Sequence, residues 1–242
     1  MSDQNYSALT PKVVLGIVAH PDDLDFGSSG TMAKFAKDGA DVYYLILTDG
    51  SKGSEDKSVT SEQLIKIRED EQKKALQILG GKKVFFLGYP DGQLEVTMNI
   101  KKEVIKIIRK IKPDVVVTMD PSMIYSSERG YINHPDHRAA GQIALDAVFP
   151  LARDHLSFPE LYEQGFRPHK TKTVLLINFD KANYYVDISS TIKTKIEALQ
   201  THKSQIKDTT QTVKWIKEMS KIIGKRAGLK QAEGFIRIDL NR

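Results

Sequence analysis

The chain has 242 residues, of which 40% are hydrophobic and 28% are charged, as in a soluble globular protein that can bury a core without disulfide bonds. It contains no cysteine, which excludes disulfides, thiolate metal sites and a cysteine nucleophile, so any bound metal must use histidine or carboxylate ligands. The net charge is +5, but the lysines are scattered along helix-like stretches and no RNA-binding motif with interleaved aromatic residues is present, so we expect no nucleic-acid partner.

Short apolar runs alternate with amphipathic stretches along the chain. The runs that predict strands cover residues 13–18, 42–47, 84–87, 115–119, 174–178 and 184–188. The stretches that predict helices cover residues 27–37, 61–79, 100–111, 139–149, 191–204 and 213–223. This order predicts an α/β fold in which helices cover both faces of a mostly parallel sheet. We see no repeat and no linker, and therefore expect residues 1–242 to form a single domain.

The N-terminal sequence MSDQNYSALTPK is polar and does not resemble a signal peptide. Residues 1–10 are expected to form a loose tail. No apolar run is long enough to cross a bilayer, so we expect a cytoplasmic protein without a membrane partner.

Unusual polar residues follow the first and the fourth predicted strands. Ligands of doubly wound sheets bind where the carboxyl ends of the strands meet and the strand order reverses. In the common order 3-2-1-4, that point lies between strands one and four. His20-Pro21-Asp22-Asp23 follows strand one, whereas Asp120 and then His134-Pro135-Asp136-His137 follow strand four. We therefore expect these segments to meet at one crevice.

Taken alone, each cluster is as typical of a polar turn that caps the next helix as it is of a functional site. Two clusters of histidine and aspartate at adjacent strand ends are better explained by a metal site. Zinc binds imidazole nitrogen and carboxylate oxygen, and a catalytic zinc site has three protein ligands and one open position. Three ligands drawn from these clusters fit that pattern.

The paired motifs Ala-His-Pro-Asp-Asp and His-Pro-Asp-His resemble those of the PIG-L/LmbE family of metal-dependent N-deacetylases. The resemblance covers nearly the whole chain. Its supporting segments are Leu47-Thr48-Asp49-Gly50, Arg68, Leu87-Gly88-Tyr89-Pro90-Asp91-Gly92, Val186-Asp187-Ile188 and the stretch from Lys195 through His202-Lys203-Ser204-Gln205. It implies a Rossmann-like fold. Many members carry glutamate after the aspartate pair, whereas this chain has Leu24 and then Asp25.

The resemblance also implies a role for each residue of the two motifs. By this match, the zinc ligands are His20, Asp23 and His137. Asp22 matches the general base and His134 the residue that stabilises the developing oxyanion.

Three further residues match supporting positions of the family. Asp136 resembles a carboxylate that supports the metal ligands from behind. Arg68 and Asp91 match positions that contact sugar hydroxyls.

These roles suit the hydrolysis of an amide. Zinc can polarise the carbonyl and activate a water molecule, from which Asp22 would take a proton. His134, if protonated, would stabilise the oxyanion. Either residue could protonate the leaving amine. The ligand set also suits Fe²⁺ or Mn²⁺.

The expected activity is zinc-dependent N-deacetylation of a 2-acetamido sugar or an N-acetylglucosaminyl conjugate. Substrates implied by the family include conjugates that lead to small thiols, chitin oligosaccharides and phosphatidylinositol-linked sugars. The family also includes homo-oligomers, so this chain could form one, but the resemblance does not fix the number of subunits. Two alternatives are a metal-dependent phosphoesterase, for which Asp120 is a further candidate ligand, and a non-catalytic nucleotide-binding module, although the GxGxxG motif is absent.

His202 has two interpretations. It could lie near the site, as the family match suggests, or it could cap the C-terminus of the helix that precedes it.

Overall fold

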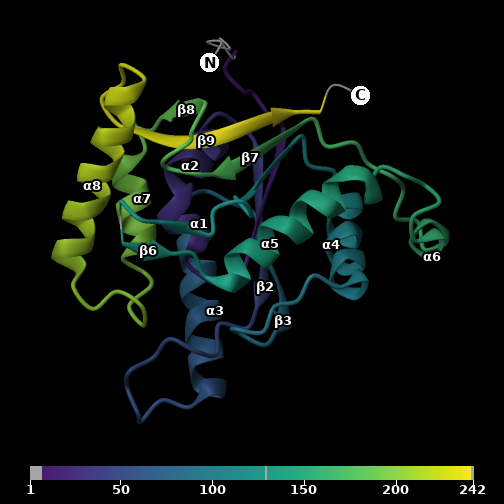
Figure 1. The fold of residues 1–242 in the computed structure, drawn as a ribbon, viewed down its shortest axis with the longest axis horizontal. Helices are drawn as coiled ribbons and strands as arrows, with labels where there is room; N and C mark the ends of the chain where they lie inside the picture. The colour runs from purple at the N-terminus through teal and green to yellow at the C-terminus, as the bar shows by residue number, and fades with distance from the viewer. Residues whose placement is uncertain (1–6, 129, 241–242) are drawn as a thin grey trace.

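The architecture is a central sheet with helices on both faces (Figure 1). A computed structural model describes residues 7–128 and 130–240. The strands are β1 (Val13–Val18), β2 (Asp41–Thr48), β3 (Lys83–Tyr89), β4 (Val115–Met119), β5 (Tyr125–Ser126), β6 (Tyr131–Ile132), β7 (Thr173–Ile177), β8 (Tyr184–Asp187) and β9 (Ala232–Asp239). The helices are α1 (Asp23–Gly27), α2 (Ser29–Lys37), α3 (Ser61–Ile78), α4 (Met98–Ile111), α5 (Pro135–Asp146), the π-helical η1 (Ala147–Leu151), α6 (Pro159–Glu163), α7 (Ile192–Leu199) and α8 (Thr209–Arg226).

The main sheet has the strand order β3-β2-β1-β4-β7-β9-β8. The first five strands in this order are parallel, which confirms the predicted α/β class and the predicted order 3-2-1-4. Strand β9 is antiparallel to both of its neighbours, β7 and β8. The point at which the order reverses therefore lies between β1 and β4, as expected.

Two hydrophobic cores cover the two faces of the sheet. Helices α2, α3, α7 and α8 pack on one face, where Met32, Leu76, Leu199 and Ile216 are buried. Helices α4 and α5 pack on the other face, where Val104, Ile108, Ile143 and Ala144 are buried. The β-branched run of β1 is buried on both sides because it lies between these cores. One domain therefore contains the whole described chain.

Several boundaries differ from the predictions. The helix expected at 27–37 corresponds to α2 and begins at Ser29, because Ser28 has a non-helical backbone; the short helix α1 that precedes it was not predicted. The helix expected at 139–149 begins earlier, at Pro135, whose fixed φ suits a first turn. The helix expected at 191–204 ends at Leu199. We did not predict β9, whose sequence mixes apolar residues with Glu233, Gly234 and Arg237, or the small β5–β6 hairpin.

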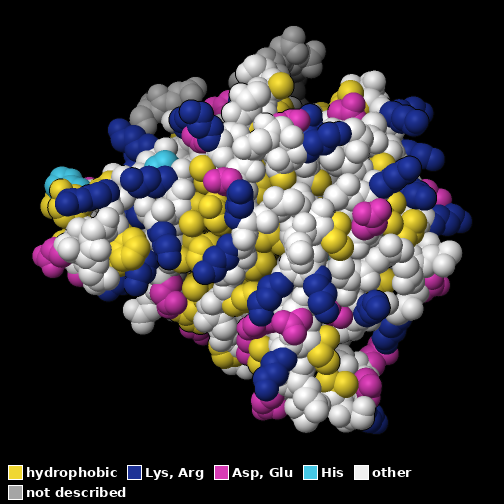
Figure 2. Space-filling model, turned by 180° about the vertical axis from the view of Figure 1, so that it is seen from behind, with side chains coloured by type: hydrophobic (Ala, Val, Ile, Leu, Met, Phe, Trp, Pro, Cys, Tyr) yellow, Lys and Arg dark blue, Asp and Glu magenta, His cyan; other side chains and the backbone are white. Residues whose placement is uncertain are grey.

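The predicted tail lies partly outside the described residues, which begin at residue 7. Residues 7–10 have no regular secondary structure, although the Leu9 amide donates to the Tyr184 hydroxyl. Among the described helices, none is both long and apolar enough to cross a membrane. On the face shown in Figure 2, lysine and arginine side chains are interspersed with acidic ones.

Candidate metal centre and active site

The turn after β1 holds Asp22 and Asp23 in a defined orientation. The Asp23 carboxylate accepts a hydrogen bond from the His20 amide, at 2.8 Å, and so closes the turn. Asp22 has a φ of 101°, in the left-handed region that residues other than glycine rarely adopt. Its amide donates to Oε1 of Gln72 on α3, at 2.8 Å. Backbone strain of this kind persists only when surrounding contacts hold it, and it is common at functional sites.

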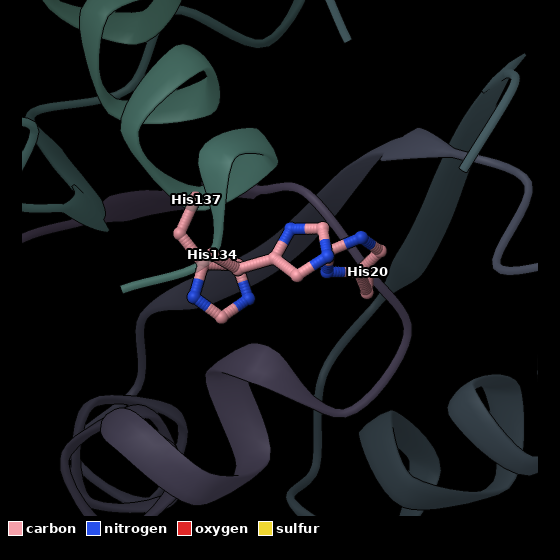
Figure 3. A group of neighbouring side chains, drawn as sticks. All are labelled: His20, His134 and His137. Carbon is pink, nitrogen blue, oxygen red and sulfur yellow. The ribbon is translucent and has the colours of Figure 1, made fainter. Parts of the chain in front are cut away.

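The first turn of α5 holds His134 and His137. His134 is the N-cap residue, and its Nδ1 accepts a hydrogen bond from the Asp136 amide, at 3.2 Å. His137 lies three residues further along the same helix and therefore on the same side. Figure 3 shows the rings of both residues gathered with the ring of His20, which comes from the turn after β1.

The three predicted metal ligands face one another. Asp23 Oδ1 lies 3.0 Å from His137 Nε2, and Asp23 Oδ2 lies 3.6 Å from His20 Nδ1. The second nitrogen of each ring is held from behind. His20 Nε2 lies 3.3 Å from Asp136 Oδ2, and His137 Nδ1 lies 3.1 Å from the Asn133 side-chain oxygen. Metal-binding histidines characteristically have their other ring nitrogen held in this way.

The donor atoms lie close enough together to hold one ion. Among the described residues, His20, His134 and His137 offer nitrogen atoms that all lie within 4.8 Å of one another. A second group within that distance consists of His20, Asp91 and Asp136. The structure therefore brings the predicted ligand histidines together with His134, and Asp23 contacts His20 and His137. Which three residues bind the ion stays a prediction.

The charges around His20 favour a cation at this position. Burial acts to lower the pKa of His20, but the carboxylates of Asp136, Asp23 and Asp91 outweigh it and raise that pKa to about 12. Burial acts to raise the pKa of Asp23, yet His137 and His20 hold it well below its usual range. The convergence of carboxylates on one imidazole is what a bound divalent cation would neutralise, so the residues present fit a metal.

Asp22 and His134 have pKa values that suit acid–base work. Burial raises the pKa of Asp22 to about 6, against the opposing effect of the Arg68 charge. Burial, together with the charges of His20 and His137, lowers the pKa of His134. The lowered pKa favours the neutral form of His134, rather than the protonated form considered from the sequence. Because its Nδ1 accepts from a backbone amide, its proton lies on Nε2.

Three further side chains support His20 and Asp22, namely those of Asp136, Asp91 and Arg68. Asp136 is buried and accepts hydrogen bonds from the amides of Gly92, at 2.7 Å, and Leu94, at 3.2 Å. The Asp91 carboxylate lies 3.1 Å from His20 Nε2 and accepts a bond from the backbone of Lys52.

Arg68 is only 4% exposed. It donates to the carbonyls of Pro21, at 2.7 Å, and Gly50, at 3.1 Å, and it lies 3.4 Å from Asp22 Oδ1. Asp91 and Arg68 also line the pocket described next, so contact with substrate stays a prediction for both.

These residues open onto a pocket of about 720 Å³. Its polar lining includes His20, Asp22, Asp23, Lys52, Arg68, Asp91, His134, His137, Asn178 and Gln205. Its apolar lining includes Phe26, Met119, Met123, Ile177, Phe179 and Trp215. A concave, largely apolar site with a few convergent polar groups is typical of small-molecule binding.

The chain also resembles known proteins. Residues 15–148 match the family described as GlcNAc-PI de-N-acetylase, or PIG-L. Diacetylchitobiose deacetylase from Thermococcus kodakarensis is 36% identical over 225 residues, which cover 92% of this chain and 82% of that protein. The chain belongs to the PIG-L family. The resemblance inferred from the two motifs is thereby confirmed.

Two further members of similar length match this PIG-L chain. A probable N-acetyl-alpha-D-glucosaminyl L-malate deacetylase 2 from Bacillus anthracis is 28% identical, over 84% of this chain and 91% of that protein. The solved structure of N,N'-diacetylchitobiose deacetylase from Pyrococcus horikoshii, complexed with its inhibitor MPG, has a TM-score of 0.87 and 31% identity. That match covers 95% of this chain and 84% of the other, so the fold is shared almost throughout.

The structure of this PIG-L chain adds residues that the sequence analysis did not single out. Asn133 orients His137 and is itself fixed by a 2.7 Å bond to the Met123 carbonyl. Gln72 bonds the Asp22 amide through one side-chain atom and Asp25 through the other. Asn133 directly precedes the second motif, and this position was its only signal. Gln72 is one polar residue on a polar helix and carries no signal.

His202 joins the site indirectly. It is fully buried, and its Nε2 lies 3.0 Å from Asp25 Oδ2, which also accepts the Gln72 amide. It therefore lies behind the turn that carries Asp22, rather than in the pocket. Of the two interpretations of His202, a residue near the site fits this position better than a residue that caps the preceding helix.

Asp120 is engaged by hydrogen bonds from neighbouring residues. Its carboxylate accepts bonds from the Ser122 amide and hydroxyl and from the Asn178 side chain, at 2.6 to 2.8 Å. It belongs to neither candidate ligand group among the described residues. Through these bonds it links the loop that follows β4 to Asn178, which directly follows β7.

Proposed function

We propose that this chain is a metal-dependent N-deacetylase that hydrolyses the acetamido group of an N-acetylglucosamine-containing sugar. The observation that carries the proposal is the arrangement around one pocket: His20, Asp23 and His137 converge, with Asp22 and His134 beside them. The names of the relatives support it, because each describes a deacetylase of an N-acetylated sugar or sugar conjugate.

His20, Asp23 and His137 would hold the metal. We propose zinc, although the same nitrogen and oxygen donors suit Fe²⁺ or Mn²⁺. When bound, such an ion supplies a Lewis acid that polarises a carbonyl oxygen and lowers the pKa of water. Asp136 and Asn133 would keep the ligand rings in place.

Asp22 is the proposed general base. Its carboxylate lines the pocket, and a pKa of about 6 leaves it ionised at neutral pH but basic enough to accept a proton from the attacking water. The contact with Arg68 and the Gln72 bond to its amide fix its position. Having accepted the proton, Asp22 can return it to the nitrogen of the leaving amine. We assign it this step because a neutral His134 has no second acidic proton.

His134 is the proposed oxyanion donor. The Asp136 amide occupies its Nδ1, so the proton on Nε2 is free to be donated to an oxygen atom in the pocket. A donor aimed at the carbonyl oxygen gains strength as negative charge develops there. His134 therefore stabilises the transition state more than the bound substrate.

The alternatives have less support. A phosphoesterase with two metals needs additional carboxylate ligands, whereas Asp120 is engaged by Ser122 and Asn178. A nucleotide-binding module needs a phosphate-binding turn after β1, where this chain has His20 to Asp23 instead.

An assay of amine release tests the proposal. Metal-free protein and protein loaded with zinc, Fe²⁺ or Mn²⁺ would be incubated with N-acetylglucosamine, N,N'-diacetylchitobiose and an N-acetylated amino acid. We expect metal-dependent release of amine from the sugars. A phosphate monoester serves as the control for the alternative activity. Phosphate release without any amine release would overturn the proposal.

The substitution Asp22→Asn tests whether Asp22 acts as the base while Asp23 binds the metal. An amide cannot accept the proton, so we expect turnover to fall on the order of 10²–10⁴-fold while metal content is retained. Rates and bound metal would be measured together. Asp70→Asn, at an exposed aspartate of α3, is the matched control. Turnover close to wild type in Asp22→Asn would reject Asp22 as the base.

A further inference from the structure

A chain of three buried polar side chains ends on the amide of Asp22, the proposed base. It consists of Gln72 of α3, Asp25 of α1 and His202 of the loop after α7, each of them 0% exposed. Burial of a polar group is costly unless its hydrogen bonds are made, and burial of a carboxylate is costlier still. None of the three lines the pocket, so contact with substrate does not account for their presence.

Gln72 meets two different partners with the two ends of its side-chain amide. Its Oε1 accepts the Asp22 N–H at 2.8 Å, and its Nε2 donates to Asp25 Oδ2 at 2.7 Å. The reversed orientation would place the NH₂ group against another donor and the oxygen against a carboxylate. Because a carboxylate offers only acceptors, Asp25 fixes which end of Gln72 faces Asp22.

His202 holds the same oxygen atom of Asp25. Its Nε2 lies 3.0 Å from Asp25 Oδ2, and this nitrogen carries the proton because its partner can only accept. One carboxylate oxygen therefore receives two donors, from His202 and from Gln72. The second donor keeps the Asp25 side chain from rotating away from Gln72.

The loop around His202 is itself fixed to α3. Thr201 Oγ1 donates to the Glu71 carbonyl at 3.1 Å, and the Ser204 amide and hydroxyl donate to the Glu71 carboxylate at 2.9 and 2.6 Å. Glu71 directly precedes Gln72 in this helix. One helix therefore sets the distance between Gln72 and His202.

The turn after β1 needs this support because Asp22 has an unfavourable backbone. Its φ of 101° lies in the left-handed region, where surrounding contacts must hold a residue other than glycine. If the turn relaxed, the Asp22 carboxylate would rotate relative to the adjacent ligand Asp23. A displacement of about 1 Å in an active site can cost roughly 100-fold in rate.

We propose that His202 and Asp25 are positioning residues, which act through Gln72 to hold the base Asp22 in the geometry for proton transfer. This inference rests on the proposed function. It has a specific consequence: loss of His202 should lower the rate of turnover only while Asp22 acts as the base, and it should leave the binding of substrate unchanged.

The kinetic test compares His202→Leu with His202→Gln in zinc-loaded protein, with N,N'-diacetylchitobiose as the substrate. Leucine removes the donor, whereas glutamine retains a side-chain N–H. In His202→Leu, we expect kcat to fall about 10–100-fold with KM and bound metal unchanged, and His202→Gln should recover most of the kcat. Leu199→Ala, at a buried position of α7, is the control and should destabilise the fold but keep the wild-type kcat.

A double variant shows whether the effect passes through Asp22. The residual turnover of Asp22→Asn would be compared with that of Asp22→Asn combined with His202→Leu. We expect equal rates, because a base that has been removed cannot be misplaced. A further loss as large as the loss that His202→Leu causes alone would mean that His202 supports the whole fold, and would overturn the proposal.

Exchange of the Asp22 amide hydrogen gives a readout that needs no turnover. Exchange would be followed by NMR, with the amides of β1 as the internal reference. In His202→Leu, we expect the Asp22 amide to exchange on the order of tenfold faster relative to that reference, whereas Leu199→Ala should leave the ratio unchanged. Gln72→Met removes the middle link of the chain and should give the same result, so the test does not depend on one variant.

A kcat unchanged in His202→Leu, or an Asp22 amide that exchanges no faster, would overturn the positioning role. The two proposals fail separately. Hydrolysis by wild type that is equally fast in His202→Leu rejects only the positioning role. Faster exchange of the Asp22 amide, in a protein that hydrolyses no N-acetylated sugar, rejects the deacetylase and keeps the control of the turn by His202.

Discussion

His134 and His137 lie three residues apart on one turn of α5, but their rings make different contacts. His137 is held at Nδ1 by Asn133, and its Nε2 faces Asp23 at 3.0 Å. His134 uses Nδ1 to cap its own helix, which leaves Nε2 toward the pocket. These contacts favour His137 as the ligand and His134 as the oxyanion donor, although the ring nitrogens of both lie near those of His20.

We expect His137→Ala to lose bound metal and His134→Ala to retain it. In His134→Ala, turnover should fall roughly 10²–10³-fold with little change in KM, because the donor acts mainly when charge develops on the oxygen. Metal content would be measured side by side on the two dialysed variants. Metal lost from His134→Ala and retained by His137→Ala would reverse the assignment.

His202 is a buried residue whose charge depends on pH. Burial acts to lower the pKa of His202, but the hydrogen bond and the charge of Asp25, together with Asp22 and Glu71, raise it above its ordinary value of 6.5. The folded state therefore holds this proton more tightly than the unfolded state. The resulting stabilisation is fully present below about pH 6.5 and is lost as the pH rises through the folded-state pKa.

We therefore expect the difference in unfolding free energy between wild type and His202→Gln to be largest near pH 6. It should shrink as the pH is raised above the folded-state pKa of His202. Urea denaturation at a series of pH values measures this difference. His155→Gln, at an exposed histidine, is the control and should track wild type. A difference that is constant with pH would mean that His202 contributes through packing alone.

Helix α5 can place its histidines because it packs very closely against the end of β4. Gly141 allows this approach, since a Cβ atom there would lie only 2.4 Å from the carbonyl oxygen of Met119. A main-chain atom cannot move aside as a flexible side chain can. Any larger residue must therefore push the helix, with His134 and His137 on its first turn, away from the sheet.

We expect Gly141→Ala to destabilise the fold by about 1–3 kcal/mol and to weaken metal binding as well. Thermal unfolding of the metal-free protein and a metal titration would measure the two effects separately. Gln142→Ala, at the next and exposed position of α5, should change neither appreciably. Unchanged metal affinity in a destabilised Gly141→Ala variant would show that the histidines do not depend on this packing.

In the whole molecule, the site joins segments that are far apart in the sequence. His20 follows β1, His137 lies on α5, and the parallel pairing of β1 with β4 brings them together. An ion bound by both acts as a cross-link that exists only in the folded state. The free energy of metal binding therefore adds to the free energy of unfolding.

Zinc at about 100 times its dissociation constant should stabilise the fold by about 2.7 kcal/mol, which corresponds to a rise in Tm of roughly 5–10 °C for a domain of this size. Differential scanning calorimetry with zinc and after chelation would measure the shift. His137→Ala should show none of it. An equal shift in wild type and His137→Ala would place the bound zinc elsewhere.

The sequence by itself determined the elements and motifs whose signals are local. The apolar runs at 13–18 and 115–119 coincide with β1 and β4, because a strand buried between two layers of helices is apolar on both faces. The motif at His20 follows β1 directly and the motif at His134 ends the loop that follows β4, so their meeting could be predicted from strand order. Only the tertiary structure decided the position of β9, the link from Gln72 through Asp25 to His202, and the contact of Phe26 with Trp215. Each joins residues that are distant in the chain, and such contacts depend on packing that leaves no periodic pattern in the sequence.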